Sequence, residues 1–97
     1  MIVAELSIVP VGEDVSVSRF VRAALSAIEK EGVVFQPTAM GTIIEAGDKK
    51  TLFSVVEKAS DAVFSLGAKR VVTRLSIDER IDKEISIKSK IDSLERK

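Results

Sequence analysis

The sequence contains no cysteine, histidine, tryptophan or tyrosine. Without cysteine the chain has no disulfide, no thiolate nucleophile and no cysteine-ligated zinc. Without histidine it lacks Ser-His-Asp catalysis and the commonest metal ligand. These absences argue against most classes of enzyme and against a metal centre. We therefore expect no catalytic residues, no metal-binding residues and no cofactor.

An excess of charge of one sign is also lacking, because 15 Lys and Arg balance 15 Asp and Glu. No broad electrostatic field then favours nucleic acid or an anionic membrane. The chain has no run of about 18 apolar residues and does not begin with the features of a signal peptide. We expect a cytoplasmic protein with no nucleic-acid or membrane partner. Asparagine is absent and Gln36 is the only glutamine, a deficit of heat-labile amides that is typical of thermophilic sources.

Hydrophobic periodicity is present throughout the chain and predicts four strands and three helices. The strands are expected at residues 2–9, 33–36, 42–46 and 69–79. The helices are expected at residues 17–31, between Asp48 and Gly67, and from Ser86 onward. Ser16, Asp48 and Ser86 are candidate N-caps of these helices, since their side-chain oxygens can accept a backbone N–H.

The order strand-helix-strand-strand-helix-strand predicts a single ferredoxin-like α+β domain over residues 1–97. Right-handed crossovers place two helices on one face of a four-stranded antiparallel sheet with strand order 4-1-3-2, and a C-terminal helix follows. In the first strand Ile2, Ala4 and Leu6 share a fully apolar face, whereas Glu5 and Ser7 lie on the other. This pattern is typical of a sheet that helices cover on one side only.

The uncovered face of the predicted sheet carries charged side chains among apolar ones. Glu5, Glu45, Arg74 and Asp78 are expected to converge there. Either this face is solvated and carries cross-strand ion pairs, or it is a subunit interface that traps a few charges beside a small-ligand site. The C-terminal helix either packs on its own domain or docks on a neighbouring subunit, and both alternatives agree with a homo-oligomer.

Several functions that this fold can host do not fit the residues. RNA-recognition domains stack bases on aromatic residues of the central strands, and here those strands carry Glu5 and Glu45 instead. Metal chaperones need cysteines, which are absent. Acylphosphatase-like enzymes need an arginine after the first strand, where this chain has Glu13 and Asp14. Two classes remain, namely a small-molecule-binding module and a regulatory or scaffolding domain that senses another effector.

Short segments in a characteristic order resemble the thiamine-binding-like family, also described as domain of unknown function 77 and uncharacterised protein family 0045. The segments are residues 10–12, 37–42, 44–45, 70–73 and 77–80, and the helix around Lys88. The family is related to YkoF, which binds thiamine and its hydroxymethylpyrimidine part. The resemblance implies a ferredoxin-like protomer that forms homodimers or homotetramers, binds thiamine or a pyrimidine precursor, and does not catalyse a reaction.

The ligand site implied by this resemblance lies where the second and third strands meet residues 10–18. The expected ligand-binding residues are Ser18, Thr38, Met40, Gly41, Thr42, Glu45, Asp78 and Arg80. A carboxylate of Glu45 or Asp78 can accept from the pyrimidine amine and offset the thiazolium charge, and hydroxyl groups can bind ring nitrogens.

Two sets of these residues also allow a purely structural interpretation. Residues 38–42 can serve only as a hairpin turn, with Gly41 present for a positive φ. Arg80, like Arg70, either binds a phosphate or pairs with Asp78 and Glu79.

Overall fold

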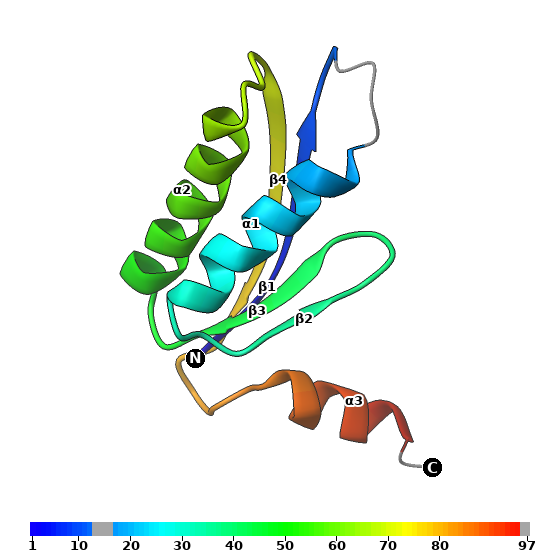
Figure 1. Ribbon diagram of the computed structural model, residues 1–97. Coiled ribbons are helices and arrows are strands. Elements are labelled where there is room, and N and C mark those ends of the chain that lie inside the picture. Colours follow the sequence, from blue (N-terminus) through cyan, green and yellow to red (C-terminus); the bar gives the residue numbers. More distant parts are fainter. Residues whose placement is uncertain (13–16, 96–97) are drawn as a thin grey trace.

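The computed structural model describes residues 1–12 and 17–95 of the chain. The elements are β1 (Ile2–Pro10), α1 (Ser18–Lys30), β2 (Phe35–Pro37), β3 (Thr42–Ala46), α2 (Lys49–Ser65), β4 (Val71–Glu79) and α3 (Ile87–Glu95). The strands form one antiparallel sheet in the order β2-β3-β1-β4. This arrangement confirms the predicted ferredoxin-like fold. Figure 1 shows α1 and α2 side by side on one face of the sheet.

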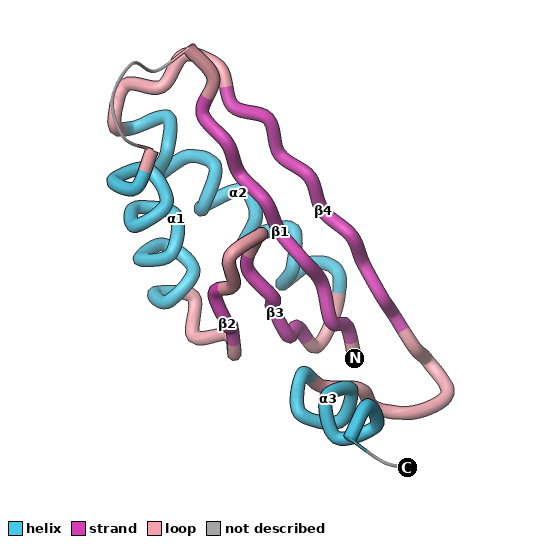
Figure 2. The backbone as a smooth tube through the Cα atoms, turned by 90° about the vertical axis from the view of Figure 1, so that its right-hand side faces the viewer, coloured by secondary structure: helices cyan, strands magenta, loops and turns pink. Residues whose placement is uncertain are grey.

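The hydrophobic core lies between this helical layer and the sheet. Ile2, Ala4 and Leu6 of β1 are buried in it, as the alternation of the strand predicted. They pack against apolar stripes at helical spacing on both covering helices, for example Phe20 on α1 and Leu52 on α2. Helix α3 contacts the opposite face of the sheet through Glu45 and Asp78. Both views of the chain place α3 at the end of the sheet where the N-terminus lies (Figures 1 and 2).

The second strand differs from its prediction, since it runs from Phe35 to Pro37 rather than over residues 33–36. Pro37 lies inside the strand and is opposite Thr42. Val34 accepts the backbone N–H of Glu45, so residues of even number direct their main-chain groups to β3 and Pro37 directs its own outward. The missing N–H of proline therefore removes no sheet hydrogen bond on this edge strand.

Two of the three predicted N-caps are present in the structure. Asp48 Oδ1 accepts the backbone N–H of Thr51 at 2.7 Å at the start of α2. Ser86 Oγ accepts the backbone N–H of Ser89 at 2.9 Å at the start of α3. The third candidate, Ser16, lies outside the described residues, and α1 begins at Ser18 after Val17. Among the helices of the described ranges, none combines the length and apolar character that crossing a membrane requires.

The Asp48 cap predicts a pH-dependent contribution to stability. The hydrogen bond from the Thr51 backbone N–H lowers the pKa of the Asp48 carboxyl group. Its contribution is therefore present above the pKa of the unfolded chain and is lost as pH falls through the lower folded-state pKa. We expect Asp48→Ala to lower the thermal midpoint at pH 7, and we expect this difference from the wild type to shrink on acidification. Asp48→Asn keeps an acceptor oxygen and is the control, because it caps without titrating.

Candidate functional site

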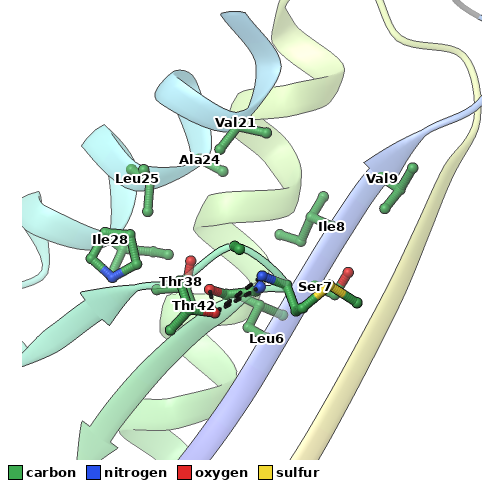
Figure 3. Close-up of a pocket in the computed structure, with 14 residues that line it drawn as sticks. Leu6, Ser7, Ile8, Val9, Val21, Ala24, Leu25, Ile28, Thr38 and Thr42 are labelled. Carbon is green, nitrogen blue, oxygen red and sulfur yellow. Dashed lines mark hydrogen bonds between the residues drawn. The ribbon is translucent and has the colours of Figure 1, made fainter. Parts of the chain in front are cut away.

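A cavity of about 230 Å³ lies between α1, β1 and the turn that joins β2 to β3. Val21, Leu25 and Ile28 of α1 form one wall, and Leu6 and Ile8 of β1 lie opposite (Figure 3). The turn at residues 38–41 closes a third side. The site was predicted where the second and third strands meet residues 10–18. The strands and their turn contribute, and helix α1 forms the facing wall. Residues 13–16 of the predicted segment lie outside the described residues.

The cavity exists because two neighbouring strands differ in length. β1 has nine residues and β3 has five. β3 is paired with β1 only from Ile2 to Leu6, whereas β4 accompanies β1 as far as Pro10. Figure 2 shows β1 and β4 continuing together beyond the β2–β3 hairpin. The cavity thus occupies the place that a longer β3 would fill.

Thr38 builds the turn that borders the cavity. Its Oγ1 accepts the backbone N–H groups of Met40 and Gly41, both at 3.2 Å, and donates to the Gly41 carbonyl at 2.9 Å. The Thr38 backbone N–H also donates to the Gly41 carbonyl, at 2.7 Å. These bonds use the hydrogen-bonding capacity of the Thr38 hydroxyl, so this side chain shapes the site.

Gly41 is needed for a different reason than a positive φ. The glycines of positive φ in the described ranges are Gly12, Gly32 and Gly67, so that part of the turn interpretation is wrong. A Cβ atom on Gly41 would instead lie 2.9 Å from the carbonyl oxygen of Leu6. The turn approaches the main chain of β1 so closely that no side chain fits between them.

The other two predicted residues of the turn region offer groups to the cavity. Thr42 is opposite Leu6 in the sheet, so its side chain lies on the helix-covered face. Its hydroxyl makes no hydrogen bond with another described residue and remains available to a ligand. Met40 also lines the cavity, and 83% of its surface is exposed to solvent.

Glu45 and Asp78 lie on the opposite face of the sheet from this cavity. Both are opposite Val3, on β3 and β4 respectively. Glu45 Oε1 accepts the backbone N–H of Ile87 at 2.6 Å, and Asp78 forms an ion pair with Lys90. The two carboxylates thereby hold α3 against the open face. Of the two alternatives for this helix, the structure shows that it packs on its own domain.

Removing the Glu45 carboxylate is expected to release α3 without unfolding the core. A hydrogen bond to a charged group contributes about 1.5 kcal/mol or more, which corresponds to roughly a tenfold change in a local opening equilibrium. We therefore expect Glu45→Ala to speed amide hydrogen exchange in α3 about tenfold while exchange in β1 stays unchanged. Asp92→Ala is the matched control, because the Lys88–Asp92 ion pair is exposed and lies on α3 itself. Equal exchange in both variants would contradict this role of Glu45.

Arg80 and Ser18 belong neither to the residues that line the cavity nor to the carboxylates that contact α3. Arg80 donates to Asp82 through Nε at 2.8 Å and through Nη2 at 2.5 Å. These bonds raise the pKa of Arg80 and lower the pKa of Asp82. The acid that pairs with Arg80 is thus Asp82. Ser18 is the first residue of α1 and does not line the cavity.

The structure therefore brings together four of the eight predicted residues, namely Thr38, Met40, Gly41 and Thr42. Sequence reasoning missed the apolar wall on α1 because the same helical stripe also supplies the core. One available signal was the difference in predicted strand length, which left the end of the first strand without a neighbour on one side.

None of the described residues that line the cavity is Asp, Glu, Lys or Arg, so this part of the lining is uncharged. The side chains of this described lining include no carboxylate, imidazole or amine suited to general acid or base catalysis. Within the described ranges there is also no cluster of Asp and Glu able to hold a metal ion. The arrangement is suited to enclosing a small, uncharged and largely apolar ring beside a few hydrogen-bonding groups.

The fold and this cavity define a ferredoxin-like α+β protein with a small-molecule-sized cavity beside its first helix. Sequence comparison then assigns the family. The chain belongs to the thiamine-binding protein family, whose model matches residues 4–95.

The matches to relatives of known sequence or known structure cover almost the whole chain. A Methanothermobacter thermautotrophicus protein of uncharacterised protein family 0045 is 39% identical over 98 residues, which cover 100% of this chain and 99% of that protein. A hypothetical protein of Methanocaldococcus jannaschii has a crystal structure that matches with a TM-score of 0.87 and 38% identity, covering 96% and 94% of the two chains.

A third comparison supports the fold alone. A Thermotoga maritima protein assigned provisionally to thiamine biosynthesis or salvage matches with a TM-score of 0.82. It is 22% identical, and the match covers 96% of this chain and 97% of that one.

Proposed function

We propose that the chain is a non-catalytic cytoplasmic protein that binds the pyrimidine ring of thiamine, or hydroxymethylpyrimidine, in the cavity between α1, β1 and the β2–β3 turn. Membership of the thiamine-binding protein family supports the ligand class. The observation that supports the location is a cavity whose described lining is uncharged and includes the Thr42 hydroxyl, which makes no hydrogen bond with another described residue.

The size and charge of the cavity indicate which part of thiamine it would enclose. Sites for drug-sized ligands measure about 300–1,000 Å³, and this cavity is about 230 Å³. One ring fits this volume better than two. A buried cation without an opposite charge is costly, and no described residue of the lining supplies a carboxylate. The pyrimidine ring would therefore enter, while the cationic thiazolium ring would stay in water.

Isothermal titration calorimetry with three compounds tests this function. We expect hydroxymethylpyrimidine and thiamine to bind with similar affinity, and the free thiazole alcohol not to bind. The absence of saturable heat from the first two at millimolar concentration would contradict the proposal. In that case, a thermal-shift response to an amino acid or a nucleotide would favour the alternative of a regulatory domain that senses another effector.

The part of the open sheet face that α3 leaves uncovered supports a homo-oligomer. Val9 is 46% exposed there, and Val72 lies opposite it on β4. Glu5 and Arg74 share this face, and neither forms an ion pair with a described residue. In a two-fold interface the same patch meets itself, so Glu5 of one copy can pair with Arg74 of a second. A second copy would thus cover the apolar surface and neutralise both charges.

Light scattering on the purified chain tests this assembly. We expect the mass of a homodimer or homotetramer for the wild type. Arg74→Glu should shift the mass toward the monomer, because it places like charges opposite one another. Arg70→Glu is the control for the change in net charge, since Arg70 precedes β4. A strictly monomeric wild type at micromolar concentration would refute the homo-oligomer.

A further inference from the structure

The hydrogen bonds at the two ends of β1 show which neighbouring strand the main-chain N–H and C=O groups of each residue face. Val11 donates its backbone N–H to the Arg70 carbonyl at 2.9 Å, and the Met1 carbonyl accepts the N–H of Arg80 at 3.2 Å. Both bonds run toward the β4 side. Backbone groups alternate in direction along a strand, so the odd-numbered residues of β1 direct theirs to β4. The even-numbered residues direct theirs to the side of β3.

Ile8 is an even-numbered residue of β1 that has no opposite residue on β3. The even-numbered residues Ile2, Ala4 and Leu6 are opposite residues of β3, whereas Ile8 is paired across the sheet only with Thr73 of β4. Its own N–H and C=O form no hydrogen bond with another described residue. Ile8 also lines the cavity. The next even-numbered residue is Pro10, which has no N–H to offer.

An unpaired main-chain donor and acceptor beside a half-buried cavity need an explanation. Ile8 is only partly buried, so its unpaired main-chain groups are accessible either to water or to a ligand in the cavity. The residues of the turn at 38–41 form hydrogen bonds with one another and not with Ile8. The position beside Ile8 that a residue of a longer β3 would occupy is therefore not taken by a paired strand residue. A ligand placed there would meet Ile8 as a neighbouring strand residue would.

We infer that the main chain of Ile8 recognises one edge of a planar ligand ring. The N–H donates to a ring acceptor, and the C=O accepts from a donor adjacent to it on the same edge. One face of the ring then contacts Leu25 and Ile28 of α1, and the Thr42 hydroxyl is available for a further polar group.

This arrangement defines a chemical class of ligand. It comprises six-membered heterocycles that present a donor next to an acceptor, as aminopyrimidines and pyrimidinone lactams both do. Rings with acceptors alone would leave the C=O of Ile8 unpaired. The inference rests on the proposed ligand cavity and adds the feature by which that cavity selects its ligand.

A series of three small rings tests the inference by calorimetry on the wild-type chain. We expect 4-amino-2-methylpyrimidine and 2-methyl-4-pyrimidinone to bind. We expect 2,4-dimethylpyrimidine, which has no donor, to bind roughly tenfold more weakly. Equal affinity of all three would overturn the role of Ile8 and leave the proposed function standing. Binding by none of the three, nor by hydroxymethylpyrimidine, would overturn both.

Two variants of Ile8 separate its main chain from its side chain. Ile8→Pro and Ile8→Val both shorten the apolar side chain, but only the proline removes the N–H. Because this N–H makes no sheet hydrogen bond, the proline deletes no bond of the ladder. We expect Ile8→Pro to bind hydroxymethylpyrimidine roughly tenfold more weakly than Ile8→Val. Equal affinities would overturn the inference.

Amide hydrogen exchange provides a test that uses the wild-type protein alone and therefore does not depend on whether a variant folds. In the free wild-type protein the Ile8 amide should exchange faster than the Leu6 amide, which is directed to β3. Saturation with hydroxymethylpyrimidine should slow the Ile8 amide several-fold. Unchanged exchange at Ile8 in the saturated protein would overturn the inference, even if the ligand binds.

Discussion

Replacing Ala24 by phenylalanine is expected to abolish ligand binding while the fold remains intact. Ala24 lines the cavity on α1 and is only 8% exposed. A benzyl group at this position would occupy the space that we assign to the pyrimidine ring. We expect the dissociation constant of hydroxymethylpyrimidine to rise about 100-fold or more, which is about 2.8 kcal/mol. Ala24 also belongs to the hydrophobic core, so we expect the larger side chain to lower the free energy of unfolding by the roughly 1–3 kcal/mol that is typical of overpacking.

Two further variants make this result interpretable. Ser26→Phe adds the same group to an exposed position of α1 that does not line the cavity, and it should bind the ligand as the wild type does. Val21→Trp enlarges a wall residue that is 43% exposed, so it obstructs the cavity with less demand on the core. Wild-type affinity in both Ala24→Phe and Val21→Trp would show that the ligand binds elsewhere.

Replacing Gly41 by alanine is expected to give the second large effect, this time on stability. The new Cβ would lie 2.9 Å from the Leu6 carbonyl oxygen and 3.4 Å from Cγ of Glu5. The first contact is with the main chain, and Leu6 is held by its pairing with Thr42. The turn must therefore move away from β1. We expect a loss of about 1–3 kcal/mol in the free energy of unfolding, measured in urea, and weaker ligand binding as well.

Gly47→Ala is the matched control for this substitution. A Cβ on Gly47 would meet no atom within 4 Å, and Gly47 has no positive φ. We expect the alanine there to be neutral or to stabilise by about 0.4–1 kcal/mol, because it restricts the unfolded chain. If the two alanine variants had the same stability, the close approach of the turn to β1 would not explain the glycine at position 41.

The fold could be predicted from the sequence because its signals are local and repeated. The alternation in β1 and the apolar spacing in α1 and α2 each identify an element, and crossover handedness then leaves few topologies. The N-caps at Asp48 and Ser86 were recognised for the same reason, since a cap depends on residues within one turn. The predicted end of β2 at residue 36 was wrong, because Pro37 fits within a strand when the strand is at an edge and the proline nitrogen is directed outward.

The candidate site could be predicted only in part, because a site depends on which face of the sheet each residue occupies. Thr42 and Glu45 are three residues apart on one strand, and an odd spacing places them on opposite faces. Glu45 therefore contacts the backbone of α3 while Thr42 lines the cavity. The inferred role of Ile8 could not be predicted from the sequence, because it belongs to the main-chain N–H and C=O groups. The identity of the side chain does not indicate whether these groups are paired.

The most direct test of the proposed cavity is a crystal structure of the wild-type protein grown with hydroxymethylpyrimidine. We predict the ring between Ile8 and Leu25, with its amine and a ring nitrogen facing the main chain of Ile8. Electron density for the ring on the opposite face of the sheet, against Glu45 and α3, would contradict the proposed site and the inferred role of Ile8.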